Sequence, residues 1–374
     1  MSRTPLPRPT LLPGLPRIWR ASHTLQLGLD PPRAVLIDLP EPRAAGLLDL
    51  LDGSRSERLA LARAGAFGMR PDEARTLLDT LHAAGLVVPA QSLFPPAMPE
   101  RLTGEAAALA YSPGAASPAR TLRRRSAARV VVTGRARLAP GVAVALATAG
   151  VGHVHPDLTG SVDRHEIPGG PLSAADIGRP RAEAAAEAIQ RAAPGTETRT
   201  VRRGAASLVI RLGGEQPPAP PTISRAQRRQ PCLTATIREG KVLVGPLVPA
   251  AASPCLGCIA LHRRDREAAW PDAAAPPMPT PGPAEPCAAA TLLAATAYLT
   301  AEALAFLDGD TPETLGAEVE ISRPGRFRRR TWAPHPACPC VRRPASTTDR
   351  NRTFGAQMTE GRIQGGRTPS RRSQ

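Results

Sequence analysis

The chain has almost no lysine: of its 48 basic residues only Lys241 is a lysine, and the rest are arginines. A Walker-type phosphate loop needs a lysine directly after its glycine-rich turn. Lys241 instead stands in Arg-Glu-Gly-Lys-Val, the context of a hairpin, so this class of nucleotide site is excluded. Aromatic residues are also scarce, at 3% of the chain, which leaves few stacking platforms for single-stranded nucleic acid.

Long apolar runs are missing as well. No stretch of 18 apolar residues occurs, so we expect no membrane span. The first residues, Met-Ser-Arg-Thr-Pro-Leu-Pro-Arg-Pro, contain no apolar signal core. We therefore expect a cytoplasmic protein.

The charge is one-sided, with a formal net charge of +16. Residues 341–374 carry eight arginines against two acids and almost no apolar side chains, which is typical of a disordered basic tail. An excess of arginine over lysine is also what a GC-rich genome produces. Both points argue against reading the charge as a nucleic-acid-binding surface.

The first 90 residues predict a small domain of strands and helices. Residues 1–16 are proline-rich and predict an irregular lead-in. Residues 25–29 and 34–38 predict two strands, and residues 43–51, 54–64 and 70–84 predict helices. Ser54-Arg-Ser-Glu57 resembles a capping box. With a third short strand at 86–88, the pattern over residues 17–90 is that of a winged helix.

Residues 91–128 are rich in proline, alanine and serine and predict a linker with one short helix. Residues 129–340 then alternate between strands and helices, which favours an α/β domain with a Rossmann-like, doubly wound sheet. We expect strands at 129–133, 150–155, 198–201 and 207–212, and hairpins at 233–247 and 318–331. The longest predicted helices cover residues 178–193 and 288–307.

Four of the six cysteines form two tight pairs, Cys255-Leu-Gly-Cys258 and Cys338-Pro-Cys340. In a reducing compartment such pairs indicate a metal site rather than disulfides. Four thiolates suit tetrahedral zinc with no open position, which predicts a structural Zn²⁺ that staples the C-terminal region to the middle of the chain. Redox or incidental cysteines are the alternative, and His335 is an alternative ligand to one thiol of the second pair.

Two cysteines, Cys232 and Cys287, are left over. The simpler interpretation is that each is a small buried apolar residue. The alternative is an acceptor thiol, for which Cys287 is the better placed because it starts a predicted helix, where the helix dipole lowers a thiol pKa.

A strand, a glycine turn, a helix and a following acid form the frame of a dinucleotide site. Gly134 and Asp157 fit this frame, but the loop reads Gly134-x-Ala136-x-x-Ala139. Ala136 adds a Cβ where phosphate would approach the backbone. A turn without a ligand is favoured, and direct phosphate binding by Arg135 or Arg137 is the alternative.

The chain resembles the activating-enzyme superfamily, which adenylates sulfur-carrier and ubiquitin-like proteins. Within it, the chain is most similar to the leader-peptide-binding, cyclodehydratase-associated proteins of thiazole/oxazole-modified microcin (bacteriocin) biosynthesis. The resemblance covers residues 15–340 and is carried by Ala149-Gly-Val-Gly152, Gly178-Arg-Pro-Arg181, Val244-Gly-Pro-Leu-Val248, Leu261-His-Arg-Arg-Asp265 and His335-Pro-Ala-Cys338-Pro-Cys340.

The resemblance implies an ATP site made of Gly134, Ala136, Asp157 and Arg181. Arg181 stands where the family has a lysine, the family's Asn-x-x-Arg stretch is missing from residues 159–170, and the glycine loop is incomplete. These departures argue against ATP binding and predict a vestigial nucleotide site. The four cysteines match the family's zinc ligands except for the shortened second spacing.

The resemblance also implies a peptide clamp, in which the third strand and third helix of the winged helix take a leader peptide by strand addition. We assign this role to Leu86, Val87 and Val88, with Arg70 and Arg75 facing an acidic leader. Leu77, Leu78 and Leu81 are expected to form the domain core instead.

Two functions follow. The first is a non-catalytic scaffold that binds a precursor leader and presents the peptide to a YcaO-type cyclodehydratase. The second is an active ATP-dependent adenylyltransferase acting on the C-terminus of a peptide, a ubiquitin-like protein or a sulfur carrier. We favour the scaffold and leave open whether the chain is an enzyme. The superfamily also suggests a homodimer, whereas the sequence does not identify the peptide or the partner enzyme.

Overall fold

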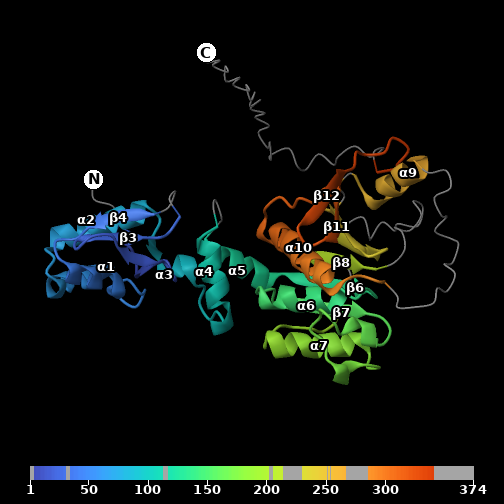
Figure 1. Cartoon of the computed structure of the whole chain (residues 1–374), viewed down its shortest axis with the longest axis horizontal. Helices are drawn as coiled ribbons and strands as arrows, with labels where there is room; N and C mark the ends of the chain where they lie inside the picture. The colour runs from blue at the N-terminus through green and yellow to red at the C-terminus, as the bar shows by residue number, and fades with distance from the viewer. Residues whose placement is uncertain are drawn as a thin grey trace, which may run out of the picture.

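The structure is a computed structural model that describes residues 4–30, 34–112, 117–201, 205–213, 230–250, 252, 254–266 and 285–340. The predicted basic tail, residues 341–374, lies outside the described residues. Figure 1 shows the N-terminal elements, a group of helices and a larger sheet following one another along the longest axis.

The larger body is built on a seven-stranded sheet with the order β12-β11-β10-β9-β8-β6-β7. Its strands, in chain order, are β6 (Arg129–Gly134), β7 (His153–Leu158), β8 (Leu208–Leu212), β9 (Cys232–Arg238), β10 (Lys241–Val248), β11 (Ala317–Arg323) and β12 (Arg326–Thr331). Strands β7, β6, β8 and β9 are parallel, and β9 to β12 continue as antiparallel neighbours. This confirms a mixed α/β fold consistent with a Rossmann-like sheet and confirms both predicted hairpins.

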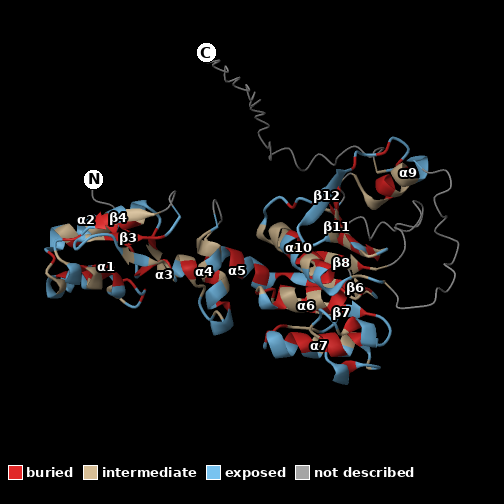
Figure 2. Ribbon diagram, in the orientation of Figure 1, coloured by how far each residue is buried: buried red, intermediate tan, exposed pale blue. Residues whose placement is uncertain are grey.

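Among the described residues, α6 (Ala139–Thr148), α7 (Arg181–Ala192) and α10 (Ala289–Asp308) pack on this sheet. The core between them and the sheet contains Val130, Val132, Leu146 and Ile189, each at most 1% exposed. Figure 2 shows this buried layer running through the sheet and its helices. Because successive side chains of a strand point to opposite faces, Val130 and Val132 face the same helical layer.

Helix α10 is the one described helix that is long and apolar enough to span a membrane. It packs against α6, β10 and β11, and buries Leu292, Ala295 and Leu299 in the core of the sheet. These contacts are those of a core helix of the α/β body.

Two predictions for this body need correction. The strand expected at 150–155 is β7, which begins only at His153, because Gly150 adopts a φ of +97° and ends the α6 turn. The strand expected at 198–201 is wrong: this polar segment forms no strand, and only an isolated bridge joins the preceding Glu197 to His153.

The N-terminal body contains two small sheets. Strands β2 (Arg17–Trp19), β3 (Thr24–Leu27) and β4 (Val35–Asp38) form one antiparallel sheet, and β1 (Pro9–Leu11) pairs with β5 (Val87–Pro89) in the other. The prediction that residues 1–16 are irregular is therefore wrong, since an edge strand tolerates Pro9 at its start. The short strand predicted at 86–88 occurs as β5, shifted by one residue, but it pairs with β1 and not with the three-stranded sheet, and a winged helix is not shown.

The predicted helices of this body occur, with differences at their starts. Residues 42–50 form the 3-10 helix η1 (Pro42–Leu50), followed by α1 (Glu57–Ala62) and α2 (Pro71–Ala83). Ser56, not Ser54, caps α1 by accepting from the Leu59 N–H. Leu78 and Leu81 are buried in the core, as expected, with Leu77 packed against it.

Residues 91–128, expected as a linker, contain most of α3 (Ala90–Leu93), η3 (Glu100–Leu102), α4 (Thr103–Ala110) and α5 (Pro118–Ala127). Buried Arg125 of α5 forms ion pairs with Glu105 of α4 at 2.6 Å and with Asp308 of α10 at 2.7 Å. This charged triad fixes the helical segment to the α/β body.

Candidate functional site

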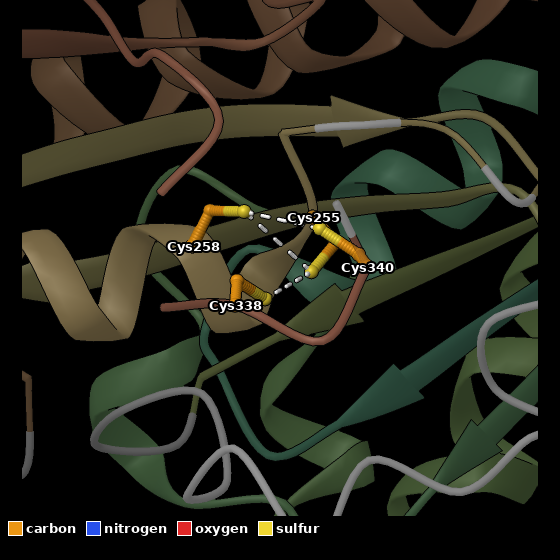
Figure 3. A group of neighbouring side chains, drawn as sticks. All are labelled: Cys255, Cys258, Cys338 and Cys340. Carbon is orange, nitrogen blue, oxygen red and sulfur yellow. Dashed lines mark hydrogen bonds between the residues drawn. The ribbon is translucent and has the colours of Figure 1, made fainter. Parts of the chain in front are cut away.

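The two cysteine pairs meet at one end of the α/β body. Cys255 directly precedes α9 (Leu256–Arg266), Cys258 lies in its first turn, and Cys338 and Cys340 follow β12. The four sulfur atoms all lie within 4.8 Å of one another. Figure 3 shows the four side chains converging from two chain segments.

The geometry of this cluster fits a tetrahedral metal. A Zn–S bond of about 2.3 Å requires sulfurs about 3.8 Å apart in a tetrahedron. The Sγ–Sγ distances are 4.0 Å for Cys255–Cys258, 3.6 Å for Cys255–Cys338 and 3.3 Å for Cys258–Cys340. The donor set is one that Zn²⁺ prefers, and all four positions are supplied by protein.

His335 is not among the converging ligands. Its Nε2 lies 2.7 Å from Asp265 Oδ2, and its Nδ1 accepts from the Ala337 N–H at 3.1 Å. Both ring nitrogens are therefore engaged, and the ring orients the Cys338 segment against α9. Burial raises the pKa of the Cys338 thiol, so metal binding there has to displace a proton.

Trp332 also helps to hold the segment of the second cysteine pair against α9. The ring is 6% exposed, and its Nε1 donates to Glu318 at 2.9 Å. His262 packs on Trp332 and, edge-on, on His335, at ring distances of 5.9 and 4.7 Å. The phrase around the second cysteine pair is thus packed against α9 by its aromatic and imidazole rings.

The loop expected to hold a nucleotide follows the C-terminal end of β6, which is the first strand of this sheet in chain order. Gly134 has a φ of +124°, and a Cβ there would collide with the Leu212 carbonyl of β8. The glycine is therefore required by the close approach of two strands. Ala136 is fully buried and belongs to the hydrophobic core.

A carboxylate of the chain occupies the mouth of this loop. Glu285 Oε2 accepts from the Arg137 backbone N–H at 3.0 Å. The Arg137 guanidinium reaches the carbonyls of Glu285 and Cys287 at 3.4 and 3.3 Å. Desolvation raises the pKa of Glu285, whereas its contacts with Arg137 lower it. Residues 285–287 are thereby tied to the turn that leads into α6.

The two other predicted nucleotide-binding residues, Asp157 and Arg181, differ in their exposure to solvent. Asp157 is exposed near the end of β7, opposite Thr133 of β6 in the register. Arg181, at the start of α7, is 6% exposed and is bonded to Glu166 and to the carbonyls of Thr159 and Ser161. The Arg181 guanidinium is thus engaged in hydrogen bonds with other groups of the protein.

The predicted peptide-binding residues also include both exposed and buried side chains. Arg70 and Arg75 are exposed on or beside α2, and Arg70 pairs with Asp72 and Glu73. Leu86 and Val87 are at most 4% exposed, in the core. Val87 and Val88 pair with β1, so one edge of β5 is already in use.

Of the remaining cysteines, Cys232 is buried and Cys287 is partly buried. Burial raises the pKa of Cys232 to about 11. Desolvation also raises the pKa of Cys287, which precedes the first residue of α10 by two positions. The raised pKa of Cys287 argues against the alternative of an acceptor thiol activated by the helix terminus, because the loss of hydration outweighs the helix dipole.

Sequence reasoning missed Glu166 and Glu285. Glu285 follows a proline- and alanine-rich stretch with no periodic pattern, so nothing in the sequence ties it to the loop near residue 137. For Glu166, the signal was the Asp163-x-x-Glu166 capping box that starts the 3-10 helix η4 (Arg164–Glu166).

Comparisons with known proteins identify the fold. No protein-family model matches the chain, and no curated protein sequence matches it. A crystal structure of E. coli MccB with AMPCPP and MccA aligns with a TM-score of 0.57 at 14% identity, over 88% of this chain and 98% of MccB. The microcin C7 biosynthetic enzyme MccB in complex with N-formylated MccA aligns with a TM-score of 0.56 at 13% identity, over 89% and 99%.

PaaA aligns with a TM-score of 0.55 at 15% identity, over 85% of this chain and 98% of PaaA. At these identities the likeness concerns the fold alone. This chain and MccB share one fold across nearly the whole length of MccB.

Proposed function

We propose that the chain is a non-catalytic, leader-peptide-binding scaffold in the modification of a ribosomal peptide of the thiazole/oxazole type. In this role it presents the peptide to a YcaO-type cyclodehydratase in the cytoplasm. The observation that carries the proposal is the carboxylate of Glu285 at the Arg137 N–H, at the mouth of the loop where a nucleotide phosphate is expected.

The argument is electrostatic. Backbone N–H groups at a helix start favour an anion, and one anion satisfies them. Glu285 supplies that anion from within the chain. A phosphate would be repelled by this carboxylate and would have to displace it in order to bind the same N–H groups. The buried pairing of Arg181 with Glu166 removes a second expected phosphate contact.

For the peptide, the structure favours a different strand from the one assigned by sequence. The three-stranded sheet ends in β4, whose outer edge pairs with no strand among the described residues. On β4, Leu36 is 62% exposed, whereas Ile37 faces the core. An extended leader adding to β4 gains backbone hydrogen bonds there and an apolar contact at Leu36. The exposed Arg70 and Arg75 favour an acidic leader.

Zinc has a structural part in this proposal. Cys255, Cys258, Cys338 and Cys340 would hold Zn²⁺ as four thiolates, with no position left for a substrate. A homodimer is part of the proposal by resemblance to the superfamily.

Calorimetric titration with Mg-ATP and with a leader peptide tests the scaffold. The scaffold requires the leader to bind and Mg-ATP to give no saturable heat. Tight Mg-ATP binding that is lost on Asp157→Ala, and kept on Glu100→Ala at an exposed acid elsewhere, would count against it.

An active adenylyltransferase is the second candidate, and one observation favours it. MccB, which shares this fold, has been crystallised with AMPCPP and MccA. Asp157 is exposed near the end of β7 and would then contact the nucleotide or its metal. Exchange of labelled pyrophosphate into ATP, abolished by Asp157→Ala, is the signature of this candidate.

A further inference from the structure

A pocket of about 220 Å³ opens on the face of the sheet that carries α9. It is lined by Arg238, Leu243, Arg263, Arg266, Glu318, Glu320, Arg328 and Arg330. These residues come from α9 and from β9, β10, β11 and β12, so five elements form its walls.

The alternation of side chains explains why the pocket is polar. Val242 and Val244 of β10 are buried in the core on the side of α10, and Leu243 between them faces the pocket. On β12, Phe327 contacts Tyr298 of α10, whereas Arg328 and Arg330 line the pocket. The apolar face of the antiparallel strands is thus used for the core, and the opposite face collects charge.

The charge of the pocket is strongly positive. Five arginines face two glutamates, and both glutamates are already bonded to cations. Glu318 pairs with Arg263 at 2.6 Å, and Glu320 pairs with Lys241 at 3.3 Å. Arg266, Arg328 and Arg330 form no ion pair with any described residue, so the positive charge of this wall is not balanced from within the described chain.

One indole ring gathers three of these guanidinium groups. The guanidinium carbons of Arg263, Arg266 and Arg330 lie 5.8, 5.3 and 5.5 Å from the centre of the Trp332 ring. Cation–π contacts restrain each arginine but do not cancel the repulsion between like charges. An anion placed among them would bind to donors that are already restrained.

The volume and the charge of the pocket limit the kinds of ligand that it can bind. Its volume is below the roughly 300 Å³ at which sites for drug-sized ligands begin. Guanidinium groups match the oxygens of phosphate in pairs. We propose that this pocket is a binding site for a small phosphate oxyanion of the diphosphate class. The site goes beyond the proposed function, which gives α9 only a part in holding zinc and assigns no ligand to the pocket face of β9 to β12.

Inorganic pyrophosphate, titrated calorimetrically into the full-length, zinc-loaded chain at fixed ionic strength, tests this site. We expect saturable binding near one equivalent. Arg328→Gln/Arg330→Gln should weaken it by roughly tenfold or more, the effect of losing one or two charge-assisted hydrogen bonds. Arg266→Glu, on the opposite wall, should weaken it similarly.

Two controls, the first of them charge-matched, make the result specific. Arg326→Gln/Arg329→Gln removes the same charge from β12 outside the pocket, and should change the affinity by less than about twofold. Arg135→Gln alters the α6 loop instead. Absence of saturable binding, equal weakening by the two β12 variants, or weakening by Arg135→Gln alone would each overturn the proposal. Binding of an acidic peptide in place of pyrophosphate would overturn it as well.

Discussion

The guanidinium of Arg181 contacts both carboxylate oxygens of Glu166, with Nε 2.8 Å from Oε2 and Nη2 2.6 Å from Oε1. The side chains are 7% and 6% exposed. The pair joins the start of α7 to η4, and the remaining donors of Arg181 go to main-chain carbonyls. Arg181 is therefore a structural residue in this state of the protein.

Arg181→Ala should destabilise the chain by about 3–5 kcal/mol, because it leaves a buried carboxylate without its cation. Urea denaturation followed by circular dichroism measures this. The matched control is Arg199→Ala, which removes an arginine whose side chain is 88% exposed beside Glu197, and should cost about 1 kcal/mol or less. Equal stabilities of the two variants would contradict the structural role.

The cysteine cluster predicts one zinc per chain in protein purified under reducing conditions. Cys258→Ser should abolish metal binding and lower the thermal midpoint, because Cys258 is fully buried and three thiolates do not close the site. Cys232→Ser, at a buried cysteine outside the cluster, should keep the metal. Elemental analysis and a thermal melt read out both effects, and zinc retained by Cys258→Ser would rule out the four-thiolate site.

The raised pKa of Glu285 predicts a dependence of stability on pH. A carboxyl whose pKa is higher in the folded than in the unfolded protein contributes stability below its unfolded pKa. That contribution is lost as the pH rises through the folded pKa. Relative to wild type, Glu285→Gln should therefore be more stable at pH 8 than at pH 5.

The comparison needs unfolding free energies of both proteins at the two pH values. Glu313→Gln, at an exposed acid, is the control and should show no such trend. A difference between Glu285→Gln and wild type that is constant with pH would show that the carboxyl is not desolvated in solution.

The unpaired edge of β4 predicts a site-specific loss of leader binding. Leu36→Asp should weaken binding of an acidic leader, because it replaces an apolar contact by a like charge. Stability should change by no more than about 0.5 kcal/mol, since Leu36 is exposed. Leu29→Asp introduces the same charge at a residue 64% exposed outside the strand and should leave binding unchanged. Fluorescence anisotropy with a labelled leader measures both variants.

The sequence predicted the fold well for helices and strands whose conformation is set by their own residues. Residues 70–84 carry Pro71, early acids and Gly85, and α2 spans Pro71–Ala83. The apolar run at 129–133 became β6, which pairs with a parallel strand on each side. The cysteine spacing predicted the cluster because closely spaced pairs of cysteines have few roles other than metal binding.

The pairing of distant segments was not predictable in this way. Strand β5 has no residue that distinguishes β1 from β3 as its partner, and β1 lies in a proline-rich stretch. The Glu285–Arg137 contact joins residues with no pattern in common. In both cases, tertiary packing decides, and the separate segments carry no signal for it.

The metal cluster also sets an order of events during synthesis. Cys338 is made about 80 residues after Cys258, which at ~5–20 residues per second corresponds to roughly 4–16 s of translation. Throughout that interval the emerging polypeptide offers only two of the four thiols of the cluster, too few to close the tetrahedral site. Metal capture can thus occur only after the final hairpin has left the ribosome, and the amount of bound metal reports how many molecules have completed maturation.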